Sequence, residues 1–261
     1  MLRPRIIPCL LVRDKGLVKT VKFGEGKYVG DPLNAVKIFN EKEVDELMIL
    51  DIDATVQERG PDFELIRNIA IESRMALCYG GGVKTVEQAK KIISLGAEKV
   101  ALSSAAIENP VIISQIAKAV GSQSVVVVID VKYRGIFKKP EVMSHNGRKT
   151  TGLSPAQFAV KCEELGAGEV VISSVDKDGM MNGFDTKLIR EIRDSISLPI
   201  TILGGASSLE DISDAIKEFG VIGVAAGSLF VFKGKYKAVL INYPNAVEKK
   251  AVLSSGGFNT Q

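Results

Sequence analysis

The sequence has few of the residues that metal centres and redox sites usually require. Its 261 residues contain one histidine, three cysteines and no tryptophan. Cys9, Cys78 and Cys162 are widely spaced without a C-x-x-C pair, so neither a disulfide framework nor a structural zinc site is expected. We predict three small buried cysteines in a reducing compartment, with no metal and no cofactor. Because His145 is alone in a polar stretch, acid and base chemistry should depend on carboxylates and lysines.

Long apolar runs and an excess of one charge are also absent. No apolar run approaches the ~18 residues that a membrane helix needs, and the first residues do not have the pattern of a secretion signal. The chain has 34 Lys and Arg against 31 Asp and Glu, a formal net charge of +3, and the basic residues form no single stripe. We therefore predict a cytoplasmic protein that binds neither membranes nor nucleic acid.

Short β-branched runs, each followed by a turn and an amphipathic stretch, recur eight times. This alternation is typical of β/α units around a parallel sheet. Helical spacing of apolar residues is clearest in 83–95, 155–165 and 209–219. The pattern predicts a single (β/α)8 TIM barrel over residues 1–245 and a polar C-terminal tail over 246–261 with little to anchor it. The predicted strands are 5–12, 47–51, 76–79, 99–102, 125–131, 169–173, 200–203 and 223–226.

The two halves of the sequence resemble each other at a shift of about 120 residues, which predicts two similar half-barrels. The stretch YGGGVKTVEQAKK, which begins at Tyr79, aligns with LGGASSLEDISD, which begins at Leu203, and their glycine pairs coincide. At a similar shift, Asp130 aligns with Leu11. One carboxylate of a symmetric pair is therefore missing.

Glycines and serines after four of the strands predict two phosphate sites. Glycine has no Cβ, so the backbone can approach an anion closely. Amides at helix N-termini and serine hydroxyls can bind phosphate oxygens. Tight turns are the other reason for such glycines, but two sites in equivalent places favour a ligand with a phosphate at each end. The candidate residues are Gly82, Ser103 and Ser104 for one site, and Gly205, Gly227 and Ser228 for the other.

Several motifs resemble the cyclase subunit of imidazole glycerol phosphate synthase, often called HisF. They are RIIPCL, GGGVKTVEQAKKIISLGAEKV, ENPVIISQIAKAVGSQSVVVVID, EELGAGEVVISSVDKDGMMNGFD and LGGA. The resemblance runs from Leu2 to Phe232, whereas the ending VFKGKYKAVLINYP is less similar. It implies a barrel that receives ammonia from a HisH-like glutaminase subunit at its lower end and uses it at the mouth. It also implies a charged gate at the lower end, made of Arg5, Glu46, Lys99 and Glu169.

The resemblance further implies two catalytic aspartates, one ending strand 1 and one ending strand 5, that act as general acid and general base. Asp130 matches the second, and we predict that it is catalytic. Leu11 occupies the first place and cannot transfer a proton, so cyclisation should lose a factor of about 10²–10⁴. Leu203 replaces a serine of the family, which makes the mouth more apolar. Possible substrate contacts are Lys19, Asp51, Ser173 and Asp178.

Three functions are compatible with these features. The first is a synthase subunit that channels ammonia to a new acceptor. Resemblance to relatives without the first aspartate implies amidation of a bacterial surface-polysaccharide sugar to an acetamidino group, with a sugar amidotransferase and a phosphorylated ligand as partners. The second is the cyclase of histidine biosynthesis, with Asp51 or Asp178 supplying the missing proton transfer. The third is a non-catalytic barrel that binds a bis-phosphate and regulates its glutaminase. The kept gate and lost carboxylate favour the first.

Overall fold

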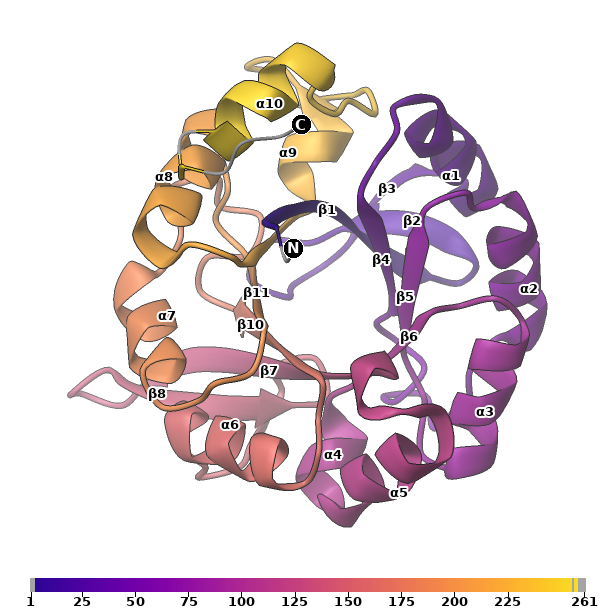
Figure 1. Cartoon of the computed structure of the whole chain (residues 1–261), viewed down its shortest axis with the longest axis vertical. Helices are drawn as coiled ribbons and strands as arrows, with labels where there is room; N and C mark the ends of the chain where they lie inside the picture. The colour runs from indigo at the N-terminus through magenta and orange to yellow at the C-terminus, as the bar shows by residue number, and fades with distance from the viewer. Residues whose placement is uncertain (1–2, 255, 258–261) are drawn as a thin grey trace.

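Eight parallel strands close into a barrel in the computed structural model, which describes residues 3–254 and 256–257 (Figure 1). The ring is closed because β12 pairs in parallel with β1 and β7 pairs in parallel with β10. The predicted (β/α)8 fold is confirmed. Around the ring the strands are β1 (Arg5–Arg13), β4 (Glu46–Asp51), β5 (Ala76–Gly80), β6 (Lys99–Leu102), β7 (Val125–Arg134), β10 (Glu169–Ser174), β11 (Ile200–Leu203) and β12 (Gly223–Ala226).

Amphipathic helices surround the strands (Figure 1). In α8, for example, Ile212, Ala215 and Ile216 are buried against the outside of the barrel, and the charged residues face away. None of the helices in the described part of the chain has both the length and the apolar character that a bilayer crossing requires. The helices are α1 (Pro32–Glu41), α2 (Phe63–Glu72), α3 (Val86–Ser94), α4 (Ser104–Glu108), α5 (Val111–Val120), α6 (Pro155–Glu164), α7 (Thr186–Arg193), α8 (Leu209–Phe219), α9 (Ser228–Val231) and α10 (Ala246–Ser254).

The same local structure recurs at the positions where the two halves of the sequence align. Thr85 caps α3 in a capping box with Gln88, and Ser208 caps α8 in a capping box with Asp211. Each box satisfies amides at the helix start that have no partner within the helix. A glycine pair with positive φ precedes both helices. The internal resemblance therefore extends from the sequence to the geometry of the turns.

The predicted strand limits agree with the structure to within one residue, with one exception. We predicted that the fifth strand ends at Val131, whereas β7 continues to Arg134. The reason is an antiparallel partner, β8 (Lys139–Ser144), which pairs with the extension of β7. Further short strands lie in the connections that follow β1, β7 and β12 at the same end of the barrel. They are β2 (Gly16–Lys19), β3 (Lys27–Gly30), β9 (Lys149–Thr150), β13 (Phe232–Lys233) and β14 (Ala238–Val239).

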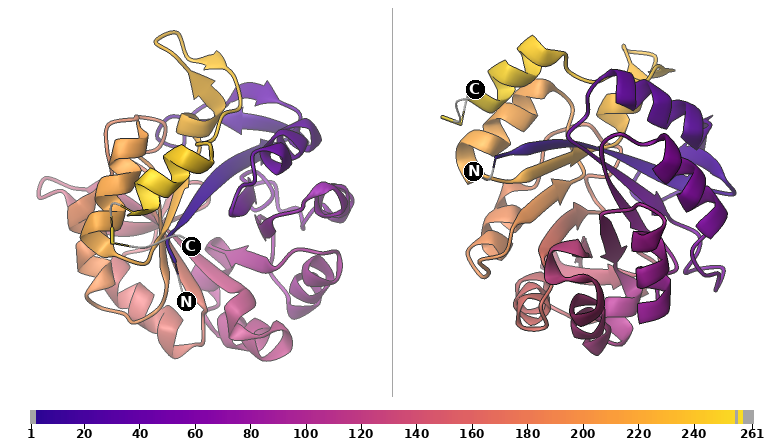
Figure 2. Two further views of the ribbon diagram at one scale, coloured as in Figure 1. Left: turned by 45° about the horizontal axis from the view of Figure 1, so that its top comes forward. Right: turned by 45° about the vertical axis from the view of Figure 1, so that its right-hand side comes forward.

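The segment after Asn245 is better anchored than its polar sequence suggests. Residues 246–254 form α10, which lies beside α8 and buries Val252 and Leu253 (Figure 2). Just before it, the hydroxyl of Tyr243 donates to the carbonyl of Ile6 at 2.9 Å. The prediction of little anchoring is therefore wrong for 246–254. The remainder of the predicted tail, apart from residues 256–257, lies outside the described residues.

Inside the barrel a second apolar core separates two polar ends. Side chains alternate between the inside and outside of each strand, so every second residue points to the axis. We call the end where the strands begin the lower end, and the end where they finish the mouth. The inward residues between these ends are buried, and the three cysteines of the chain are buried and unpaired. This inner core consists of Ile7, Cys9, Met48, Cys78, Ala101, Val126, Val128, Val171 and Ala225.

Candidate active site at the mouth of the barrel

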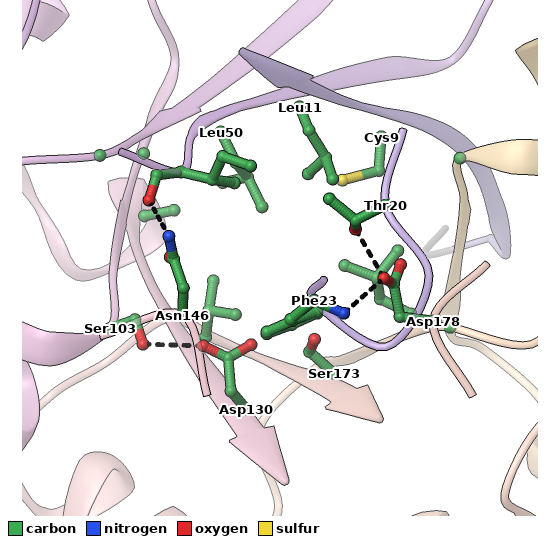
Figure 3. Close-up of a pocket in the computed structure, with 18 of the residues that line it drawn as sticks. Cys9, Leu11, Thr20, Phe23, Leu50, Ser103, Asp130, Asn146, Ser173 and Asp178 are labelled. Atoms are coloured by element: carbon green, nitrogen blue, oxygen red, sulfur yellow. Dashed lines mark hydrogen bonds between the residues drawn. The ribbon is translucent and has the colours of Figure 1, made fainter. Parts of the chain in front are cut away.

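A cavity at the mouth brings together all eleven residues that the sequence predicts for catalysis, phosphate binding and substrate contact. Leu11 lines it on β1, and Asp130 lines it on β7. Figure 3 shows Leu11, Leu50 and Cys9 on one side of this mouth cavity and Asp130 and Ser173 on the other. The predicted residues in its lining are Asp130, Gly82, Ser103, Ser104, Gly205, Gly227, Ser228, Lys19, Asp51, Ser173 and Asp178, of which Asp130 is the proposed catalytic group.

The first predicted phosphate site lies where β5 and β6 end. Gly82 has φ of 71°, and a Cβ there would lie 2.6 Å from the carbonyl oxygen of Arg59. Glycine is therefore required here by packing, whether or not an anion binds. Ser103 and Ser104 are the more informative residues, because both hydroxyl-bearing residues line the cavity at the start of α4. We call Gly82, Ser103 and Ser104 the first cradle.

The second predicted site lies where β11 and β12 end, across the cavity from the first. Gly205 is required by packing, because a Cβ would lie 2.3 Å from the carbonyl oxygen of Gly183. Gly227 leaves room for a cation, since a Cβ there would lie 2.3 Å from Nζ of Lys19. That buried ammonium donates to the carbonyl of Cys9 at 2.6 Å. We call Gly205, Gly227 and Ser228 the second cradle.

Asp130 has the electrostatic setting of a proton-transfer group. Burial raises its pKa to about 6, and hydrogen bonds from Ser173 and Ser103 oppose that rise. The hydroxyl of Ser103 donates to Oδ2 of Asp130 at 3.2 Å (Figure 3). A carboxyl with a pKa near neutrality can both give and take a proton at physiological pH. Asp178 adds to the rise through its negative charge.

The other two carboxylates of the cavity are held by the protein itself. Oδ1 of Asp51 accepts the amides of Asp53 and Ala54 at 3.1 and 3.0 Å, which closes the turn after β4. Asp178 accepts the hydroxyl of Thr20 at 2.6 Å and the amide of Phe23 at 3.1 Å (Figure 3). Burial raises the pKa of both carboxyls. Neither is free to replace the missing group at Leu11 without breaking these bonds.

Several residues of the cavity were missed by the sequence-based prediction, and Phe23 and Asn146 are two of them. Phe23 and Asn146 come from loops and extend over the cavity (Figure 3). The side-chain amide of Asn146 donates to the carbonyl of Ile52, on the far side of the cavity. Asn146 has φ of 56°, a conformation that asparagine adopts more readily than most residues. The sequence offered only the turn signal Asn-Gly, which does not indicate what the loop contacts.

Three segments at the mouth of the barrel are rich in basic residues. Residues 13–30, 132–150 and 232–239 form the hairpins that extend β1, β7 and the chain after β12. They contain 14 Lys and Arg against 3 Asp and Glu, a net +11, so the rest of the chain has net −8. The first and third hairpins touch, because Nζ of Lys27 lies 5.5 Å from the ring centre of Phe232. Such a basic rim attracts anionic ligands to the mouth.

A second polar site lies at the lower end of the barrel and contains the four predicted gate residues. Nη2 of Arg5 lies 2.7 Å from Oε1 of Glu169, and Arg5 also contacts Glu46. Nζ of Lys99 lies 2.8 Å from an oxygen of each glutamate. Two cations therefore bridge the same two anions, and we call this neutral cluster the lower ring.

The pKa values of the lower ring are shifted by its own ion pairs, and a neighbouring hydroxyl donates to one of its glutamates. Burial alone would lower the pKa of Lys99. The negative charges of Glu169 and Glu46 outweigh this effect, so the pKa lies above its ordinary value. Burial would raise the pKa of Glu169, but Arg5 and Lys99 lower it. Thr201, which the sequence-based prediction missed, donates its hydroxyl to Glu169 at 2.5 Å. All four side chains are thus paired, and pairing reduces the cost of burying charge.

Comparison with known proteins finds one family and a set of closely similar relatives. The family described as "Histidine biosynthesis protein" matches residues 5–237. Three relatives have names beginning "Putative imidazole glycerol phosphate synthase subunit". HisF of Leptospira borgpetersenii is 55% identical over 252 residues, covering 97% of this chain and 99% of its own. hisF3 of Vibrio vulnificus (strain YJ016) is 56% identical, covering 97% of both. hisF2 of Pseudomonas aeruginosa is 51% identical, covering 94% and 97%.

Proposed function

The chain belongs to the histidine biosynthesis protein family as a HisF-like synthase subunit, and from this premise we propose that it passes ammonia from a glutaminase to an acceptor at its mouth. The observation that carries the proposal is the pairing of an intact lower ring with a mouth cavity that has one carboxylate, Asp130, opposite Leu11. All four residues of the proposed ammonia gate are present in the lower ring, whereas one of the two proton-transfer groups at the mouth is replaced by Leu11.

The lower ring is suited to gating because it can open without leaving a net charge. Each cation has two anionic partners, so Lys99 can release Glu46 or Glu169 and keep the other. Above the ring, the inner core is apolar. Neutral ammonia crosses an apolar layer at far lower cost than ammonium does. A passage of this kind would therefore deliver NH₃ and hold back NH₄⁺.

At the mouth, two cradles on opposite sides favour a ligand that carries two phosphate groups. Lys19 stands beside Gly227 of the second cradle. The hydroxyl of Ser174, which lines the cavity, is buried and has no hydrogen-bond partner among the described residues. Asp130 would transfer the proton that ammonia gives up when it attacks a carbon atom. We propose that the final acceptor of the ammonia is a bacterial surface sugar, amidated by a sugar amidotransferase that is a further partner, and that the ligand of the cradles is a separate phosphorylated molecule.

The gating part is tested by co-purifying the full chain with the glutaminase subunit encoded by the same genome. The variant Lys99→Met is less stable, so circular dichroism first verifies that it is folded. The folded variant should keep the complex and its glutamine hydrolysis, but at least half of the ammonia should escape to solution instead of reaching the acceptor. Lys118→Met, an exposed lysine on α5, is the matched control. Absence of any glutaminase complex, or equal ammonia retention in both variants, would contradict gating.

The acceptor part is tested in the organism. Deleting the gene should remove acetamidino groups from the surface polysaccharide without causing a requirement for histidine. The cyclase of histidine biosynthesis is the second candidate, favoured by the pKa of about 6 at Asp130, which suits a working acid or base. Growth of a cyclase-deficient histidine auxotroph on this gene would establish that candidate and rule out the first.

A further inference from the structure

The side of the mouth cavity formed by β1 and β4 is apolar along the path between the two cradles. Leu11 and Leu50 are direct partners in the parallel pairing of these strands. Both line the cavity, and Cys9 lies below them on β1 (Figure 3). The strand order places β1 and β4 between β12 and β5, where the two cradles lie. A ligand that spans the cradles must therefore pass these side chains.

The three ionisable side chains on this side each have a partner within the protein. Arg13 lines the cavity, but its Nε donates to Asp53 at 2.8 Å. Asp51 is held by the amides of its own turn, and the ammonium of Lys19 donates to the carbonyl of Cys9. A ligand oxygen placed against Leu11 or Leu50 would lose its water and find no replacement partner, which disfavours it.

The opposite side, formed by β7 and β10, has the reverse character. Asp130 and Ser173 line it, and Ser103 donates to Asp130. The cavity is thus divided lengthwise into an apolar side and a polar side, with one cradle at each end. A ligand with hydroxyl groups on every side of the chain that joins its two phosphates would match only the polar side.

From this division we infer that the ligand which spans the cradles presents a hydrocarbon edge to Leu11 and Leu50. The inference deepens the proposed function and rests on it, since it presupposes that both cradles bind phosphate. The chemical class is a bis-phosphate with an alkyl-sided bridge, rather than a fully hydroxylated sugar chain.

The test compares bis-phosphates of equal chain length that differ only in bridging oxygens. Octane-1,8-diol bisphosphate is paired with triethylene glycol bisphosphate, and undecane-1,11-diol bisphosphate with tetraethylene glycol bisphosphate. Binding to the full chain is measured by calorimetry. In at least one pair, the alkyl member should bind about tenfold more tightly, because buried ether oxygens near the leucines lose their hydrogen bonds to water.

Variants separate this effect from the general hydrophobicity of the alkyl ligand. Leu11→Thr and Leu50→Thr should each reduce the preference for the alkyl member to about threefold or less, because a hydroxyl then faces the ligand oxygen. Leu240→Thr, a half-exposed leucine after β14, should leave it unchanged. Circular dichroism melting verifies that each variant is folded.

The outcomes are distinct. If both members of each pair bind with equal affinity, or if the preference remains in both leucine variants, the inference is wrong. The proposal that the two cradles bind phosphate is then unaffected. If no bis-phosphate binds at either length, the phosphate sites of the proposed function are wrong, and the inference is overturned with them. The alkyl preference, lost on changing Leu11 or Leu50, would support both.

Discussion

Leu11 on β1 and Asp130 on β7 line opposite sides of one cavity at the mouth of the barrel (Figure 3). The two halves of the chain place these residues in equivalent positions. One half supplies a carboxyl whose pKa is raised to about 6 by burial, and the other supplies a hydrocarbon. A reaction that needs proton transfer from both sides of the substrate cannot be supported by this pair.

Restoring the missing carboxyl should restore part of the cyclase chemistry. Leu11→Asp is expected to raise ammonia-dependent cyclisation of the family's bis-phosphate substrate by about 10²-fold, because a second proton-transfer group then faces Asp130. The rate is measured with purified protein and excess ammonium salt. Leu11→Asn is the control, since it has nearly the same shape and cannot transfer a proton. Equal rates in these two variants would show that the cavity lacks more than one group.

Removing the charge of Asp130 should stabilise the protein at neutral pH. Its carboxyl has a higher pKa in the folded chain, about 6, than in an unfolded chain, so ionisation favours unfolding. The difference between Asp130→Asn and wild type should be absent below about pH 3, where both states are protonated, and grow to about 3 kcal/mol above about pH 7. Urea unfolding at a series of pH values measures it.

An exposed aspartate supplies the control for that series. Asp214→Asn on α8 removes a solvated carboxylate that contacts Lys217 at 3.0 Å. Its effect on the free energy of unfolding should stay within about 0.5 kcal/mol at every pH. A pH-independent effect of Asp130→Asn would mean that its carboxyl is solvated in the folded protein.

Removing one cation from the lower ring should reduce the free energy of unfolding more than removing one cation and one anion together. Lys99→Met leaves two buried glutamates facing Arg5 alone, and the expected loss is about 3–5 kcal/mol at pH 7. The loss should shrink as the pH falls toward the ordinary glutamate pKa, because the unpaired carboxylate is then protonated. Adding Glu169→Gln should recover at least half of it, since Arg5 and Glu46 then form a neutral pair.

Chemical denaturation at pH 7 and pH 4.5 distinguishes these cases. If Lys99→Met and the double variant are equally unstable, pairing of charge is not what stabilises the ring. If the single variant loses less than about 1 kcal/mol, the cluster is as weak as an exposed surface ion pair.

Asp178 should hold residues 20–26 between β2 and β3, which we call the first loop, closed over the cavity. Asp178→Ala removes the acceptor for the hydroxyl of Thr20 and the amide of Phe23. Each hydrogen bond to a charged acceptor contributes about 1.5–3 kcal/mol, so loop opening should increase at least tenfold. The measurement is the rate of tryptic cleavage after Lys22 under native conditions. Asp178→Asn, which keeps one acceptor oxygen, should give a smaller increase.

A neighbouring aspartate tests whether this effect is local. Asp176 accepts the amide of Tyr133, on β7, at 2.8 Å, so Asp176→Ala should leave cleavage after Lys22 unchanged. Faster cleavage in both variants would indicate general loosening of the barrel mouth, and Asp178 would lose its particular role.

Much of the barrel could be predicted from the chain alone, because its signals are local. A strand such as β11 is a short apolar run, and a helix such as α8 is set by three- and four-residue spacing and its Ser208 cap. The absence of a carboxylate at position 11 also needed only the comparison of the two halves. Helix 83–95 was predicted too long at its start, because Thr85 adopts an extended conformation to cap α3.

What the sequence determined by itself is the order of β/α units and the place of each strand, since these depend on neighbours within a few residues, and the single carboxylate of the pair, which follows from aligning the two halves. Only the tertiary structure decided that Arg5 and Lys99 share the same two glutamates, that Asp51 and Asp178 are already engaged, and that Leu11 and Leu50 form one wall. Those relations arise when the ring closes, because closure brings residues far apart in the chain to one end of the axis and lets burial set their charge and partners.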